Sequence, residues 1–179
     1  MNQLNVAPQV GVEKRHTLSV LVQDVDGIIS RIAGMFTRRG FPMYSFSSAR
    51  TEVEGIQRIT VVAYGDEVVV QQITKQLNKL VDVLKVVRLD EDTTIARAML
   101  LVKVSADNTT RPHVVDAANI FRARIVDVAP ESVVIEATGT PGKLGALLDV
   151  LEPFGIREYL HSGEIALSRG PKTMFPQKS

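Results

Sequence analysis

A short polar turn with the sequence QDVDG contains the groups best suited to binding a small molecule. The backbone N–H groups from Val25 to Ile28 would open a helix, where unpaired donors and the helix dipole attract an anion such as a carboxylate. Asp24 and Asp26 stand beside them and would attract an ammonium group. Together these are the two charged groups of an amino acid. The residues alone favour a simpler alternative, an ordinary helix start that Asp26 caps.

Groups that would support catalysis or hold a metal do not converge. The chain has no cysteine, which excludes disulfides, thiol catalysis and cysteine-ligated metals. His16, His113 and His161 fall in separate predicted elements, and Asp116, three residues after His113, does not complete a ligand set. The acidic turn QDVDG lacks the further ligands of a calcium loop. We therefore predict neither a catalytic site nor a metal site in this chain.

The elements that would position the polar turn follow the order β-α-β-β-α-β. β-branched and aliphatic residues predict four strands: residues 16–22, 43–51, 55–63 and 81–89. Apolar residues at helical spacing predict one helix that starts after Gly27 and stops at Gly40. A second helix is predicted after Asp66 and Glu67, whose negative charges suit a helix N-terminus.

The same order recurs after a charged stretch at residues 90–94, with different residues. Strands and helices are predicted at 95–106, 113–123, 124–130, 132–139, 141–155 and 156–170, the last interrupted at Gly163. We predict an α+β protein of two ferredoxin-like βαββαβ domains, each an antiparallel sheet with its helices on one face. The expected divisions are a flexible leader (1–15), an N-terminal domain (16–90), a C-terminal domain (95–170) and a flexible tail (171–179).

Nucleic-acid and nucleotide binding are poorly supported. The segment ATGTPGKLGALL lacks the phosphate-loop spacing, and Thr140 with Pro141 accounts for it as a helix start. The βαββαβ order is shared with RNA-binding RRM domains, but HTLSVLV and GIQRITVVA carry no aromatic residue on which bases would stack. The net charge of +1 gives no general attraction for nucleic acid or membranes. No segment approaches the ~18 apolar residues of a membrane span, so a cytoplasmic protein is expected by default.

Several long segments resemble one family. LSVLVQDVDGIISRIAGMFTRRGF and RITVVAYGDEVVVQQITKQLNKLVDVLKV resemble the ACT domain that opens the acetolactate synthase (acetohydroxyacid synthase) small subunit. NIFRARIVDV, GTPGKLGALLDVLEPFGIRE and LSRG resemble its second half. The resemblance covers residues 16–170, nearly the whole chain, and its motifs are long and ordered.

This resemblance implies a regulatory subunit without its own active site. Such a subunit binds and activates a large catalytic subunit, which carries thiamine diphosphate, magnesium and FAD. That enzyme condenses pyruvate with a second 2-keto acid, the first common step to valine, leucine and isoleucine. The small subunit itself is expected to bind no cofactor and to form a homodimer through its ACT domain. Family members also confer feedback inhibition, commonly by valine bound where two ACT domains meet.

The resemblance also implies which residues bind the effector. Gly27 stands at the glycine that lets the backbone approach the ligand carboxylate, and Asp24 at a position that is often asparagine. Val25, Asp26 and Ile28 complete that turn.

The second wall of the family's pocket usually reads Gly-Phe/Tyr-Asn-Ile-x-Ser-Leu, and here it begins Gly-Phe-Pro-Met, with Pro42 and Met43 at the third and fourth positions. Pro42 replaces the asparagine that supplies a side-chain amide across the interface, and proline has neither that amide nor a backbone N–H. Losing a hydrogen bond to a charged ligand group costs about 1.5–3 kcal/mol, or tenfold and more in affinity. We therefore expect weak or absent valine inhibition, with activation retained.

Two other functions are weighed against this one. A free-standing ACT-type amino-acid sensor would use the same turn without a catalytic partner. An enzyme in its own right would need convergent titratable groups, which the sequence does not provide.

Overall fold

The computed structural model describes residues 14–175. Residues 1–13 of the predicted leader (1–15) and residues 176–179 of the predicted tail lie outside the described residues, and residues 14 and 15 begin the first strand. The described chain divides into two units. The first combines residues 14–94 with residues 168–175, and the second is residues 95–167. None of the described helices is long and apolar enough to cross a membrane.

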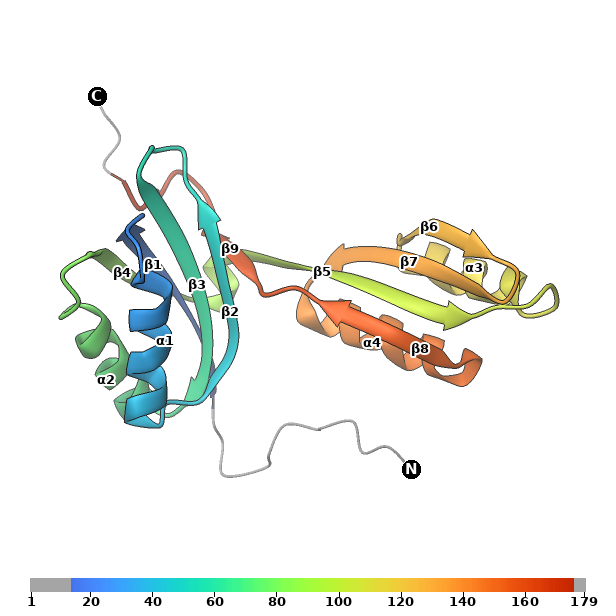
Figure 1. Ribbon diagram of the computed structural model, residues 1–179, viewed down its shortest axis with the longest axis horizontal. Helices are drawn as coiled ribbons and strands as arrows, with labels where there is room; N and C mark the ends of the chain where they lie inside the picture. Colours follow the sequence, from blue (N-terminus) through green and yellow to red (C-terminus); the bar gives the residue numbers. More distant parts are fainter. Residues whose placement is uncertain (1–13, 176–179) are drawn as a thin grey trace. The chain divides into compact units, whose positions relative to one another are not determined.

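The first unit has the predicted β-α-β-β-α-β order. Its elements are β1 (Lys14–Gln23), α1 (Ile28–Arg39), β2 (Met43–Arg50), β3 (Ile56–Gly65), α2 (Glu67–Leu77) and β4 (Val83–Leu89), followed by a 3₁₀ turn (Glu91–Thr93). The strands form an antiparallel sheet in the order β2-β3-β1-β4. Both helices cover one face of this sheet (Figure 1).

Apolar spacing and end signals in the sequence account for the two helices. Helix α1 buries Ile28, Ile32, Met35 and Phe36 against the sheet. Ile29, the fifth apolar residue of the predicted stripe, is exposed. It ends at Gly40, whose φ of 64° is a left-handed conformation that glycine adopts without strain. Helix α2 begins at Asp66, whose carboxylate accepts a hydrogen bond from the Val69 N–H at 2.9 Å.

The second unit repeats this architecture and adds one strand. Its elements are β5 (Thr94–Ser105), α3 (Arg111–Ile120), β6 (Arg124–Ala129), β7 (Ser132–Gly139), α4 (Pro141–Leu151), a 3₁₀ turn (Glu152–Phe154), β8 (Ile156–His161) and β9 (Ile165–Ser168). The sheet order is β6-β7-β5-β8, and β9 also pairs with β5 (Figure 1). The predicted interruption at Gly163 is the break between β8 and β9.

The first part of the predicted tail contacts the first unit through Met174. Met174 is only 8% exposed, and its carbonyl accepts a hydrogen bond from Lys85 Nζ at 3.1 Å. Sequence patterns missed this contact because one apolar residue among polar ones has no periodicity. Residues 168–175 therefore belong to the first unit.

Candidate functional site

The turn between β1 and α1 brings Asp24, Val25, Asp26, Gly27 and Ile28 together at one end of the first sheet. Gly27 occupies the N-cap position with φ at 79°, a left-handed conformation that side chains other than glycine rarely adopt. A Cβ atom added there would meet nothing within 4 Å, so the backbone is open to close approach. The prediction that Asp26 caps the helix is wrong, because no side chain caps α1.

Two of the four expected backbone donors are used within the turn. The Val25 N–H donates to the Gln23 carbonyl at 3.0 Å, and the Ile28 N–H donates to the Val25 carbonyl at 3.2 Å. The N–H groups of Asp26 and Gly27 donate to no acceptor among residues 14–175. An anion at this turn would therefore be held by these two adjacent donors and by the positive end of the helix dipole.

Asp24 is held in place from the side of β3. Its carboxylate oxygen Oδ1 accepts a hydrogen bond from Gln57 Nε2 at 2.5 Å. Gln57 Oε1 in turn accepts from the Ser48 hydroxyl at 2.6 Å, and the Asp24 N–H donates to the Gly55 carbonyl at 2.8 Å. These bonds orient an exposed carboxylate next to the open amides, where it can accept from an ammonium group.

Asp26 is held from the other side by an arginine. Arg31 donates from Nη2 to the Asp26 carbonyl at 3.2 Å and from Nη1 to Asp82 Oδ2 at 2.5 Å. Because the peptide unit is planar and trans, a carbonyl that points to Arg31 directs the Gly27 N–H of the same unit to the opposite side. No local sequence pattern marks Arg31, Asp82 or Gln57, because their partners lie 33 or 51 positions away along the chain.

Pro42 and Met43, the other predicted effector residues, lie at the opposite end of the same sheet. Met43 pairs with Ala63, which also faces His16 at the start of β1. The turn lies beyond Gln23 at the other end of that strand, and seven residues of strand at about 3.3 Å each make roughly 20 Å. The 12 residues of α1 carry the chain back along the sheet. One chain therefore does not bring the two predicted walls together, and a pocket containing both requires a second copy.

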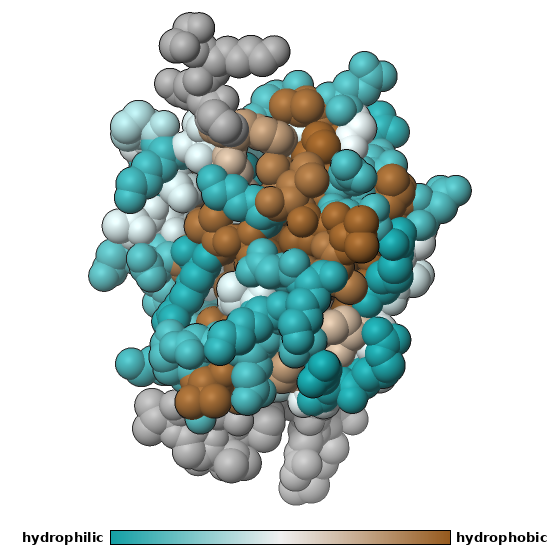
Figure 2. All heavy atoms as spheres, turned by 90° about the vertical axis from the view of Figure 1, so that its left-hand side faces the viewer, coloured by the Kyte–Doolittle hydropathy of each residue, from teal (hydrophilic) through white to brown (hydrophobic). Residues whose placement is uncertain are grey.

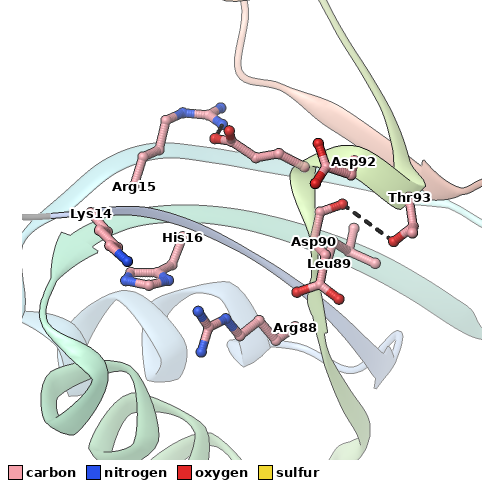
Figure 3. Close-up of a pocket in the computed structure, with 9 residues that line it drawn as sticks. Lys14, Arg15, His16, Arg88, Leu89, Asp90, Asp92 and Thr93 are labelled. Carbon is pink, nitrogen blue, oxygen red and sulfur yellow. Dashed lines mark hydrogen bonds and ion pairs between the residues drawn. The ribbon is translucent and has the colours of Figure 1, made fainter.

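A separate cavity of about 560 Å³ lies near the start of β1 (Figure 3). Basic side chains line one part of it, and the acidic turn that follows β4 lines another; the lining residues are Lys14, Arg15, His16, Arg88, Leu89, Asp90, Glu91, Asp92 and Thr93. Arg88 donates to both carboxylate oxygens of Glu67, at 2.5 and 2.7 Å. This bond lowers the pKa of Glu67 and raises that of Arg88.

The charges of this cavity are compensated within the chain. Arg15 lies 3.5 Å from Glu91, and His16 Nε2 lies 3.0 Å from the Gly65 carbonyl oxygen. A free anion would compete with Glu67 for Arg88 and would face three carboxylates across the cavity. The turn at Gly27, with its two open amides, is therefore the better candidate site. Within residues 14–175, no group of three or more His, Asp or Glu side chains is placed to hold a metal ion.

Comparison with known proteins decides the family. The acetolactate synthase small subunit of Mycolicibacterium smegmatis is 51% identical over 157 residues, which cover 88% of this chain and 92% of that relative. This chain belongs to the acetolactate synthase small subunit family. The probable small subunit of Methanothermobacter thermautotrophicus is 45% identical over 160 residues, 89% of this chain and 95% of the relative. The family predicted from the sequence segments is thereby confirmed.

The family assignment extends to both units. Residues 18–85 match the small-subunit-like ACT domain of this enzyme, and residues 97–170 match the small subunit of acetolactate synthase. The crystal structure of the small subunit from Thermotoga maritima is similar, with a TM-score of 0.83 and 32% identity. The match covers 89% of this chain and 99% of that one. The predicted fold of two βαββαβ units is confirmed, and the chain is a regulatory small subunit with an ACT domain.

Proposed function

We propose that this chain raises the activity of an acetolactate synthase catalytic subunit and has no active site of its own. The observation that carries this proposal is the identity of about one half to small subunits over nearly the whole chain. In this proposal, thiamine diphosphate, magnesium and FAD are bound by the catalytic partner.

A branched-chain amino acid, valine first among them, is the effector in this proposal. Its carboxylate accepts from the open N–H groups of Asp26 and Gly27, and its ammonium group donates to Asp24. The fixed orientation of both partners supports this assignment, because donors and acceptor are held before the ligand arrives. Both charges of the ligand are then matched, which distinguishes an amino acid from a 2-keto acid.

The effector site is completed by a second copy of the chain. β2 is an edge strand, with a neighbour on one side only within residues 14–175, and an exposed edge can pair with another chain. β2 begins at Met43 and ends at Arg50, whose partner Gln57 also faces Val22 near the turn. Two β2 edges paired antiparallel about a twofold axis would bring Pro42 and Met43 of one copy toward the turn of the other.

Regulation follows if the effector binds one arrangement of the two copies better than another. Only that difference in affinity can shift the equilibrium, and a coupling of roughly 1–3 kcal/mol gives a useful response. A ligand that contacts both copies makes contacts that depend on their docking. Pro42 removes one expected contact, so we expect weak feedback inhibition and retained activation.

The chain must also contact its catalytic partner. Figure 2 shows apolar residues gathered in the middle of one face, surrounded by polar ones. Exposed large apolar residues of the first unit include Ile29, Val68, Val81 and Leu84. Apolar surface of this kind is available for a subunit interface.

Reconstitution with a catalytic subunit tests the proposal. Pyruvate condensation is measured for the catalytic subunit alone, for this chain alone, and for both together, with and without valine, leucine or isoleucine. We expect a higher rate for the mixture and none for this chain alone. If the chain neither raises the rate nor co-purifies with the catalytic subunit but binds an amino acid, the free-standing sensor is the better assignment.

A further inference from the structure

The first sheet has a second buried face, which we call the outer face. Leu18, Val20 and Val22 of β1 point into the core beneath the helices. Because side chains alternate along a strand, Thr17, Ser19 and Leu21 point to the opposite side, yet they are only 5%, 1% and 3% exposed. The cross-strand neighbours of these residues belong to the same face: Arg58, Thr60 and Val62 of β3, and Lys85, Val87 and Leu89 of β4.

The C-terminal segment contacts this outer face through one residue. The Ser19 hydroxyl donates to the Met174 sulfur at 3.0 Å, and Lys85 Nζ donates to the Met174 carbonyl at 3.1 Å. Residues 169–173 just before it are all exposed, whereas Met174 is buried. A single buried anchor within an exposed stretch is the arrangement of a bound peptide, in which one side chain enters a site and the flanking backbone stays in solvent.

We infer that the outer face is a binding site for an extended peptide, occupied by this chain's own C-terminal segment with Met174 as the anchor. Two features of the site match a methionine. The Met174 side chain is buried although its neighbours in the segment are exposed, and its thioether sulfur accepts from the buried Ser19 hydroxyl. The Lys85 ammonium holds the carbonyl of the same residue, which aligns the peptide backbone.

The segment is detachable because so little of it is buried. Both hydrogen bonds described between the outer face and the segment go to Met174, and Thr173 Oγ1 donates within the segment to the Phe175 carbonyl. The Arg169 N–H donates to the Thr93 carbonyl at 2.7 Å, so the segment stays close to the first unit even when the anchor leaves. A tethered ligand rebinds at a high effective concentration, so a weak anchor suffices in the intact chain.

The test uses the full-length chain with Met174→Asp, which places a carboxylate against the buried face and empties the site. Thr173→Asp is the matched control, because it makes the same charge change at an exposed neighbour. The probe is a fluorescently labelled synthetic peptide, RGPKTMFPQKS, with the sequence of residues 169–179. Its binding is followed by anisotropy, and amide hydrogen exchange of β1 and β4 is measured in parallel.

The peptide is expected to bind the Met174→Asp chain and not the wild-type or Thr173→Asp chains, whose sites are filled. Exchange in β1 and β4 should rise roughly tenfold or more in Met174→Asp alone and fall again when peptide is added. A peptide carrying aspartate at the methionine position should have no effect. The inference is overturned if the peptide binds none of the three chains, binds all of them equally, or leaves exchange in β1 and β4 unchanged.

A Met174→Asp chain that fails to fold would be replaced by Met174→Gly, which removes the anchor without adding a charge. Binding of the peptide to this chain, and not to a Thr173→Gly control, would support the site, and equal behaviour of the two would refute it. No step of this test depends on an effector or a catalytic subunit, so it stands or falls separately from the proposed function.

Discussion

The hydroxyl of Ser19 donates a hydrogen bond to the sulfur of Met174 at 3.0 Å, across 155 positions of the chain. This contact joins the first strand of the protein to its C-terminal segment. The first unit is therefore built from both ends of the described chain, with the second unit inserted between them. Residues 168–175 thus belong to the same unit as the segment that matches the ACT domain, residues 18–85.

Met174→Ala should destabilise the first unit. Removing a buried methionine side chain leaves a cavity and an unpaired Ser19 hydroxyl, so we expect a loss of about 2 kcal/mol, the low end for such truncations because the site lies near the surface. Urea denaturation would measure this as a lower midpoint. The control is Lys172→Ala, an exposed change in the same segment, and equal midpoints for the two variants would contradict the packing described here.

Asp66→Ala should weaken the start of α2. Its carboxylate accepts from the Val69 N–H, and loss of such a cap costs about 1 kcal/mol. Thermal unfolding followed by circular dichroism would report it. Asp90→Ala is a matched control, because Asp90 precedes a 3₁₀ turn without a side-chain cap bond. If Asp90→Ala lowered the midpoint temperature of unfolding as much as Asp66→Ala, the lost cap bond would not be the cause of the destabilisation.

Gly27→Ala and Gly145→Ala should have opposite effects on stability. Neither added Cβ would meet an atom within 4 Å, so the backbone conformation decides the sign. At Gly27 the left-handed φ of 79° should cost an alanine roughly 1–2 kcal/mol. Gly145 lies inside α4, where alanine is favoured over glycine by about 1 kcal/mol. Urea titrations would give the free energy of unfolding of each variant. If both variants were more stable than the wild type, or both less stable, the prediction would be wrong.

Pro42→Asn should strengthen inhibition by valine in the reconstituted enzyme. The restored amide can hydrogen-bond a charged ligand group, which corresponds to about tenfold in the half-inhibitory concentration. Activation without valine should stay the same. Pro130→Asn, at an exposed proline of the second unit, is the control and should not alter inhibition. Strong valine inhibition in the wild type, or no gain in Pro42→Asn, would contradict the assignment of this position.

The Glu67–Arg88 pair should make stability depend on pH in acid. The hydrogen bond from Arg88 lowers the pKa of Glu67 in the folded state below its ordinary value of 4.5. A lowered folded-state pKa means that the stabilisation is fully present above the unfolded pKa and is lost as the pH falls through the folded one. The difference in unfolding free energy between wild type and Glu67→Gln should therefore be constant near neutral pH and shrink below about pH 4.5. A Glu52→Gln control should follow the wild type, and a difference unaffected by acid would refute the pairing.

The sequence by itself determined the elements and the family. Periodicity of 2 and 3.6 residues, glycines at Gly27 and Gly40, and the acidic start of α2 are local signals, because each depends on residues within one or two turns of chain. Long matched segments then identified the small subunit. The wrong prediction at Asp26 has a local cause too: an acidic residue just before a helix is typical of a cap, but Gly27 occupies the cap position and no side chain caps the helix.

Only the tertiary structure decided how the candidate site is held and what completes it. Gln57 reaches Asp24 across 33 positions, Arg31 reaches Asp82 across 51, and Met174 reaches Ser19 across 155. The position of Pro42 at the far end of the sheet from Gly27 likewise follows from strand register. Contacts of this kind depend on which distant segments meet in the folded chain. A single sequence contains no periodic or local pattern that predicts these meeting points.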